Sequence, residues 1–237
     1  MNPTTLQRHI KEALGCSISK EQAGLLFAHL SFIVKQNEAL NLTSIRDLET
    51  GAVLHVEDSL AALPEIEAAP DGGLVDLGSG AGFPGIPLAL MTTRKSVLVE
   101  ARAKKARILQ SFVQRHAFDG QIAVEALRIE DYGAVAPEQF AVATARALGS
   151  LPVLMELAAP LLQVGGLLVA YKARLSEEEW QSAVSVETVL GMKTQEPRTF
   201  LLSDGTSQRS IVRIVKQAES KISLPRRVGK AQKRPLA

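Results

Sequence analysis

The chain has 237 residues, enough for one large α/β domain with an appendage or for two small domains. Its 46% apolar residues exclude a disordered chain, and its 4% aromatic residues argue against recognition of bases by many stacked rings. The formal net charge is only +2, but residues 1–65 carry five Lys or Arg against eight Asp or Glu, whereas residues 221–237 carry six Lys or Arg and no acid.

The location of the protein is predicted from three absences. Cys16 is the single cysteine, so an internal disulfide framework is excluded and a reducing cytosol is favoured. The N-terminus lacks the apolar core of a signal peptide. The most apolar stretch, 147–171, is interrupted by prolines and a Gly-Gly pair, so no membrane span is expected. We expect a cytoplasmic protein.

Residues 1–67 are predicted to form an N-terminal helical extension. The segment from Ser19 to Gln22 resembles a capping box, and apolar residues follow it at helical spacing. Residues 41–45 interrupt the helix, and a further helix is predicted over 47–63, ended by Pro64.

Residues 68–218 are predicted to form an α/β domain, which begins in the turn-like stretch 68–73. Short apolar strands then alternate with helices, a pattern typical of a parallel sheet covered on both faces. The last two strands, near 200–202 and 211–215, are expected to form a hairpin. A mostly parallel, Rossmann-like sheet with a terminal antiparallel hairpin distinguishes class I methyltransferases from nicotinamide dehydrogenases. The predicted strands before the hairpin lie near 74–77, 96–100, 122–124, 141–144 and 167–171.

Glycines crowd the segment that follows the first predicted strand. They permit positive φ and close approach of a ligand to the backbone, and the helix that follows offers free amides to negative groups. Residues 80–85 also satisfy the GxGxxG pattern of dinucleotide-binding proteins, so the glycines alone do not identify the ligand. The glycines are Gly78, Gly80, Gly82 and Gly85.

The residues around this glycine turn favour S-adenosyl-L-methionine (AdoMet). Asp76 ends the strand, where a carboxylate helps to bind the cationic methionine moiety directly or through water and would repel a pyrophosphate. Pro84 lacks a backbone N–H that a phosphate would use. Glu100 lies where an acid binds a ribose diol in either class of protein. Glu130, followed by Asp131, lies where methyltransferases commonly contact adenine. Each acid alone fits a surface position, but the three together favour a nucleoside site.

The sequence also restricts the methyl acceptor. Cys16, in the helical extension, is the only candidate for the nucleophile that pyrimidine carbon-5 methylation needs, and 144–147 reads Thr-Ala-Arg-Ala instead of the Asn/Asp-Pro-Pro-aromatic motif typical of adenine amine methylation. No Cys/His cluster offers metal ligands, so no metal is expected. Such a site suits guanine N7, which carries no proton to remove.

Arg146 is the candidate catalytic residue. Its guanidinium, after the fourth strand, is suited to the AdoMet carboxylate, a phosphate or guanine O6. The alternative is an ion pair within the fold. His55 and Asp58 share a helix face and fit two interpretations: they line the acceptor pocket, or they form an ordinary surface pair, which we favour. The basic tail, 219–237, suggests a polyanionic partner, most simply nucleic acid, with a solvated disordered tail as the alternative.

On these residues the sequence resembles the RsmG (GidB) family, bacterial methyltransferases that act on guanine N7 of 16S rRNA. The matching segments are 41–45, 55–60, the glycine turn through Pro87, 144–147, 170–172 and 224–236. The family often has Asp at the position of Glu100, and Leu-Arg-Ile-Glu-Asp at 127–131 replaces a commoner Arg-Ala-Glu form. The AdoMet contacts that the resemblance implies are Gly78, Phe83, Glu100, Ala101, Arg102, Ile129, Glu130 and Arg146.

The resemblance implies an AdoMet-dependent protein that binds 16S rRNA or the small ribosomal subunit. We expect a monomer. The basic tail is the expected RNA contact, and Lys104, Lys105 and Arg107 either face the rRNA or begin a solvated helix. Three alternatives are a nicotinamide oxidoreductase, which would bind NAD(H) in place of AdoMet, an RNA-binding module without turnover, and a small-molecule methyltransferase, which leaves the basic tail unexplained.

Overall fold

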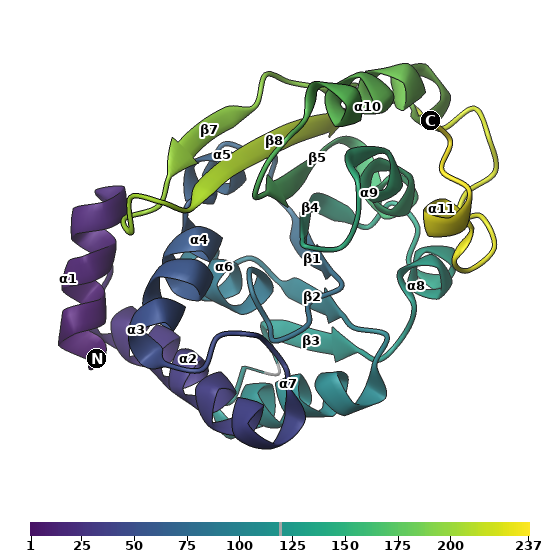
Figure 1. Cartoon of the computed structure of the whole chain (residues 1–237). Coiled ribbons are helices and arrows are strands. Elements are labelled where there is room, and N and C mark those ends of the chain that lie inside the picture. The colour runs from purple at the N-terminus through teal and green to yellow at the C-terminus, as the bar shows by residue number, and fades with distance from the viewer. Residues whose placement is uncertain (119) are drawn as a thin grey trace.

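One eight-stranded sheet runs through the centre of the molecule (Figure 1). In the described residues, 1–118 and 120–237 of a computed structural model, the strand order is β3-β2-β1-β4-β5-β8-β6, with β7 also beside β8. The first five strands are parallel, and β8 runs antiparallel to β5, β6 and β7. The strands are β1 Gly73–Leu77, β2 Ser96–Val99, β3 Ile122–Glu125, β4 Phe140–Arg146, β5 Leu162–Lys172, β6 Met192–Thr194, β7 Arg198–Leu201 and β8 Gln208–Lys216. The predicted parallel sheet with a terminal antiparallel hairpin is confirmed, and the short β6 is an addition.

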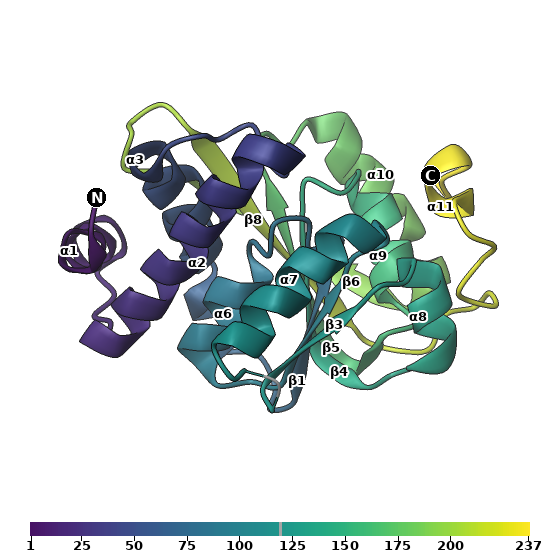
Figure 2. The same ribbon diagram turned by 90° about the horizontal axis from the view of Figure 1, so that it is seen from below.

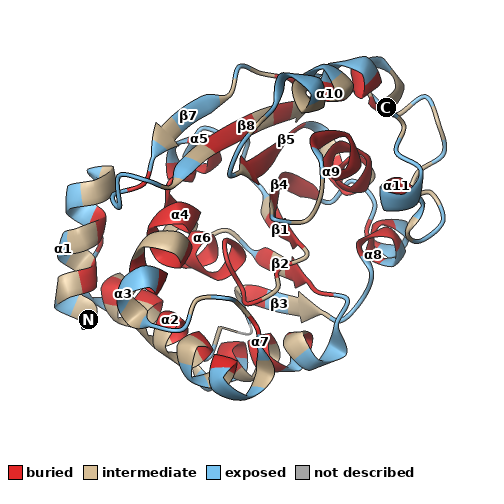
Figure 3. Ribbon diagram, in the orientation of Figure 1, coloured by how far each residue is buried: buried red, intermediate tan, exposed pale blue. Residues whose placement is uncertain are grey.

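Helices cover both faces of the sheet, as the alternation of strands and helices predicts (Figure 2). Successive strand residues point to opposite faces, so Leu74 joins one buried cluster and Val75 the other. The first cluster includes α6 (Gly85–Thr92) and α7 (Ala103–Arg115), and the second includes α8 (Ile129–Val135), α9 (Leu151–Ala158) and α10 (Glu177–Leu190). Buried residues follow the strands and the inner sides of these helices (Figure 3).

The N-terminal extension consists of α1 (Pro3–Leu14), α2 (Lys20–Leu40), α3 (Leu48–Gly51), the π-helix η1 (Ala52–Glu57), α4 (Asp58–Leu60) and α5 (Leu63–Glu67). The capping box at the start of α2 is confirmed, because Ser19 and Gln22 exchange side-chain and backbone hydrogen bonds. The prediction of a single helix ended by Pro64 is wrong. Pro64 lies in the first turn of α5, where its missing N–H would have no helical partner.

The extension and the sheet share one core. Leu26 and Leu30 of α2 belong to the same buried cluster as Leu74 and Leu98 of the sheet. The predicted boundaries therefore follow changes in the sequence pattern. The division into the domains 1–67, 68–218 and 219–237 stays a prediction. None of the described helices is long and apolar enough to span a membrane.

Arg94 holds the connection between α5 and β1. Its guanidinium donates hydrogen bonds of 2.7 to 3.1 Å to four backbone carbonyls, those of Ile66, Ala69, Pro70 and Gly72. The Ile66 carbonyl lies in the last turn of α5, and the other three carbonyls follow the end of this helix, where intrahelical donors run out. One side chain thus fixes the path by which the extension enters the sheet.

We predict that Arg94→Met lowers the free energy of unfolding by about 2 kcal/mol, because four carbonyls lose charged donors while the apolar stem is kept. Chemical denaturation measures this change. Lys95→Met, at the exposed next position, is the matched control and should change stability by less than about 0.5 kcal/mol. Equal effects of the two substitutions would show that the four hydrogen bonds of Arg94 do not stabilise the fold.

Candidate functional site

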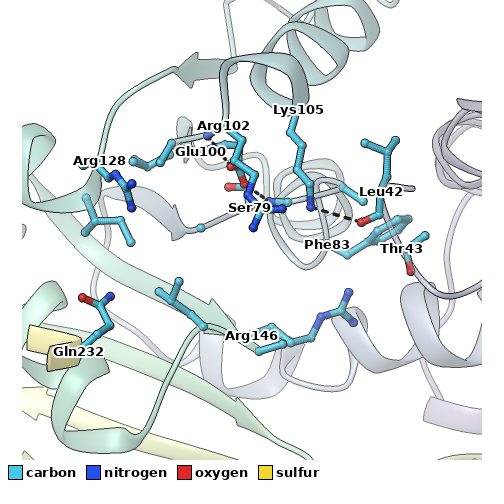
Figure 4. Close-up of a pocket in the computed structure, with 18 of the residues that line it drawn as sticks. Leu42, Thr43, Ser79, Phe83, Glu100, Arg102, Lys105, Arg128, Arg146 and Gln232 are labelled. Carbon is cyan, nitrogen blue, oxygen red and sulfur yellow. Dashed lines mark hydrogen bonds between the residues drawn. The ribbon is translucent and has the colours of Figure 1, made fainter. Parts of the chain in front are cut away.

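A cavity of about 520 Å³ lies at the carboxyl ends of β1 to β4 (Figure 4). The glycine turn, the segments after β2, β3 and β4, the extension and the C-terminal segment all contribute to its wall. In open α/β sheets, ligands bind at this edge, where the strand order reverses next to β1. Among the predicted site residues, those that line the cavity are Gly78, Gly80, Phe83, Glu100, Ala101, Arg102, Ile129, Glu130 and Arg146.

The glycine turn has a backbone that only glycine adopts readily. Gly78 and Gly82 have φ values of 68° and 86°. A Cβ on Gly78 would lie 2.8 Å from Leu148 Cδ1, and one on Gly82 would lie 2.9 Å from His29 Nε2. The turn therefore needs glycine for its backbone and for the space that its neighbours occupy.

Asp76, at the end of β1, and Gly82, within the turn, are not among the residues that line the cavity. Asp76 is fully buried; its Oδ1 accepts a hydrogen bond of 2.7 Å from Thr144 Oγ1, and its Oδ2 one of 3.3 Å from the Gly85 amide. Burial raises the pKa of this carboxyl, against the hydrogen bonds and the Arg146 charge, which lower it. Asp76 thus ties the turn to β4 and to the start of α6, so its effect on a ligand passes through the turn.

Glu100 and Glu130 face the cavity, and both carboxylates hold backbone amides. Glu100 accepts hydrogen bonds from the Gly80 amide (2.9 Å) and the Arg102 amide (2.7 Å), so it ties the glycine turn to the start of α7. Glu130 accepts one of 2.7 Å from the amide of Gly229. Each carboxylate has further lone pairs for a ligand.

Phe83 lies between two buried histidines. Its ring stacks on His55, with centroids 4.5 Å apart and planes at 7°, and packs against His29 at 4.3 Å. The pKa of both imidazoles is lowered to about 3, by burial in each case and for His55 also by the charge of Arg146. The two rings are therefore neutral near pH 7, and they fix the only aromatic ring of the glycine turn.

Arg146 is held by the extension. Its Nη1 donates to Asp58 Oδ2 (2.9 Å) and to the Leu54 carbonyl (3.2 Å), and its Nη2 donates to His55 Nδ1 (3.4 Å). Because arginine is only a donor, His55 Nδ1 must accept, and its Nε2–H then donates to Thr43 Oγ1 at 3.0 Å. Arg146 thus has the ion pair within the fold that was the alternative to a catalytic role, and it also lines the cavity.

The interpretation of His55 and Asp58 as a surface pair is wrong. Their exposed fractions are 7% and 2%, because η1 and α4 pack against the sheet edge and bring both side chains to Arg146. Arg209 of β8 donates from Nε to Asp58 Oδ1 at 2.9 Å, so one carboxylate is shared by two guanidinium groups. A π-helix at a functional site is a recurrent feature of proteins.

A second cavity, of about 530 Å³, adjoins the first. The two share Thr43, His55, Arg146 and Ala147 as lining residues. The second cavity is also lined by three further cationic residues, Lys172, Arg174 and Arg209. Cations line the first cavity too, namely Arg102, Lys105 and Arg128, and Asp58 also lines the second. His55 and Arg146 thus lie between the cavity built on the glycine turn and a second cavity that carries further cations.

Several lining residues were not predicted. Thr43 lies in the predicted interruption at 41–45, and Lys105, whose Nζ approaches the Leu42 carbonyl at 3.4 Å, lies in the basic run. Gln232, in the C-terminal segment, has no signal in the sequence (Figure 4). The remaining ones are Leu42, Ser79, Ala81, Val99, Arg128, Ala147 and Leu148. Among the described residues, no group of three or more His, Cys, Asp or Glu could hold a metal ion.

The sheet order, the antiparallel β8 and the glycine turn after β1 define a class I methyltransferase fold. The chain is similar to an O-methyltransferase from Bacillus cereus in complex with SAH, with a TM-score of 0.60 and 15% identity over 90% of this chain and 97% of that one. A protein from Corynebacterium glutamicum has a TM-score of 0.53 and 15% identity, over 82% of this chain and 92% of that one. At this identity the likeness concerns the fold.

The sequence comparisons are more specific. The family model described as rRNA small subunit methyltransferase G (GidB) matches residues 22–212. The ribosomal RNA small subunit methyltransferase G of Pelotomaculum thermopropionicum is 36% identical over 98% of this chain and 100% of its own length. The one of Desulfitobacterium hafniense is 33% identical over 98% of this chain and 96% of its own length. The chain belongs to the family of rRNA small subunit methyltransferases G.

We predict that the free energy of unfolding falls as the pH drops below 6.5, the ordinary pKa of histidine. In the folded protein His29 and His55 have a pKa of about 3 and stay neutral, whereas in the unfolded chain they bind protons, so acid favours unfolding. Each histidine should contribute up to about 1.4 kcal/mol per pH unit between about pH 6 and pH 4.

Denaturation of the wild type and of His55→Gln across this range measures the effect. Loss of the contacts of His55 shifts the whole curve of unfolding free energy against pH, whereas loss of its titrating ring reduces the slope of that curve. We expect a slope smaller by about 1 kcal/mol per pH unit in the variant. Parallel curves would show that His55 titrates normally in the folded protein.

Proposed function

We propose that the protein transfers a methyl group from AdoMet to N7 of a guanine in 16S rRNA. The observation that carries the proposal is the pair of adjoining cavities, one built on the glycine turn and the other lined by cations, with His55 and Arg146 between them. Membership in the family of rRNA small subunit methyltransferases G agrees with this proposal.

The residues of the first cavity fit AdoMet. Its volume of about 520 Å³ is in the range of small-molecule sites. Glu100 would hold the ribose hydroxyls, the segment at Ile129 and Glu130 would hold the adenine, and the glycine turn would hold the methionine moiety. When bound, AdoMet supplies a methyl group on a cationic sulfur, which is electrophilic without a metal.

The groups between the two cavities do not provide a free base. Both ring nitrogens of His55 are hydrogen-bonded and its pKa is about 3, and the carboxylate of Asp58 is shared by two guanidinium groups. An acceptor that must lose a proton would find no group here to take it, whereas guanine N7 attacks with its own lone pair. The protein's task is then to align the base with the methyl group and to exclude water.

The cations of the second cavity fit an RNA acceptor. Arg174 is exposed, while Lys172 pairs with Glu179 at 2.7 Å and Arg209 pairs with Asp58. Lys104, Arg107 and the cations Arg227, Lys230, Lys233 and Arg234 of the C-terminal segment are exposed as well. Phosphate contacts of this kind position a nucleic acid without reading its bases. Action in the cytoplasm as a monomer stays a prediction from the sequence.

The direct test uses small ribosomal subunits that lack the modification, incubated with AdoMet labelled in its methyl group. We expect label in 16S rRNA, at a guanine whose N7-methylated ring becomes sensitive to chemical strand cleavage. Label on another atom would contradict the choice of N7, and no label in either the subunit or naked 16S rRNA would refute the function.

A second prediction separates the two roles of Arg146. Arg146→Met and Arg209→Met each remove one cation from Asp58, so both should lower the melting temperature by a few degrees. Only Arg146 also faces the first cavity, so Arg146→Met should lower kcat by about 100-fold, and Arg209→Met by less than about 10-fold. Equal losses of kcat would show that Arg146 acts only through the ion pair.

A further inference from the structure

The C-terminal segment, residues 224–236, returns to the first cavity. After β8 the chain passes over the face of the sheet that α8, α9 and α10 cover. There α11 (Lys230–Lys233) packs on α9, close to α8 (Figure 1). Ala231 is 1% exposed, and Leu224 and Leu236 pack against the buried cluster of that face. The segment is therefore ordered against the body of the protein, unlike the solvated disordered tail that the sequence left open.

A buried ion pair anchors this segment. Arg226 donates from Nε to Glu156 Oε1 at 2.6 Å and from Nη2 to the other carboxylate oxygen, a bidentate arrangement. The side chain of Glu156 is only 3% exposed. The same guanidinium also donates to the Arg234 carbonyl at 3.0 Å, which closes the segment on itself. Removal of either charge would leave the other buried without its partner.

The anchored segment reaches the cavity at two points. The Gly229 amide, in a turn with φ of 74°, donates to Glu130 Oε1 at 2.7 Å and so fixes the carboxylate that lines the cavity. Gln232 lines the cavity itself, with its amide on the side of Arg128 (Figure 4). A glutamine amide both donates and accepts, which matches the donor and acceptor that adenine presents at N6 and N7.

We propose that residues 224–236 form a wall of the cofactor site, with Gln232 as a binding residue for the adenine end of AdoMet and Gly229 as a positioning residue for Glu130. This inference rests on the proposed function, since it concerns the same AdoMet site. It assigns the segment a role besides contact with RNA, and it makes cofactor affinity dependent on residues far along the chain from the glycine turn.

The test is calorimetric titration with SAH, which reports binding without turnover. Gln232→Ala should weaken binding by about 3- to 10-fold, the cost of one or two lost hydrogen bonds. A chain that ends at Ser223 should weaken it by about 10-fold or more, because Glu130 also loses its Gly229 partner. Gln217→Ala, at an exposed glutamine outside this segment, is the matched control and should stay within about twofold of the wild type.

Gln232 is exposed, so its substitution tests the proposal even if the shortened chain does not fold. Wild-type affinity for SAH in Gln232→Ala would overturn the proposal, as would wild-type affinity in a folded chain that ends at Ser223. Failure of the wild-type protein itself to bind SAH would instead refute the proposed function. The two failures are therefore distinguishable.

Discussion

The carboxylate of Asp58 is the buried charge on which the site depends. It lies on the extension, 2% exposed, and it is held by Arg146 at the end of β4 and by Arg209 on β8. A buried carboxylate is costly unless it is paired, so the two guanidinium groups stabilise this position of the extension on the sheet. Tyr171 of β5 strengthens the same junction, because its hydroxyl donates to the Ser59 carbonyl at 2.8 Å.

This junction determines the chemistry between the two cavities. Since Asp58 orients Arg146, the guanidinium can donate to His55 Nδ1, and the neutral imidazole then stacks on Phe83 of the glycine turn. A protonated His55 would place a second cation beside Arg146 in a buried region, which is unfavourable. The result is a rigid wall without a free base, which suits a reaction that needs alignment more than proton transfer.

Much of the fold could be predicted because it depends on local patterns. The alternation of apolar strands with helices determines the parallel sheet, and positive φ values after β1 explain Gly78, Gly80 and Gly82. The acids at 100 and 130 follow β2 and β3, so topology alone places them at the same edge. These features need no knowledge of contacts between distant segments.

The features that were missed depend on such contacts. Burial of Asp58 requires Arg146 and Arg209, which lie 88 and 151 residues away, so the sequence around η1 is equally consistent with a surface helix. Docking of the C-terminal segment depends on Arg226 and Glu156, 70 residues apart. A run of basic residues without acids is typical of a free tail, and nothing in it identifies the one arginine that turns inward.

The position of the C-terminal segment links the two ligands. Its anchored side holds Glu130 and presents Gln232 to the first cavity, and its exposed side carries Arg227, Lys230, Lys233 and Arg234. If the proposed RNA acceptor binds these cations more tightly in the docked segment, then by thermodynamic reciprocity a cofactor that needs the docked form must favour RNA binding by the same factor. A disordered tail would bind phosphate equally well without this coupling, because its cations would be independent of the cofactor site.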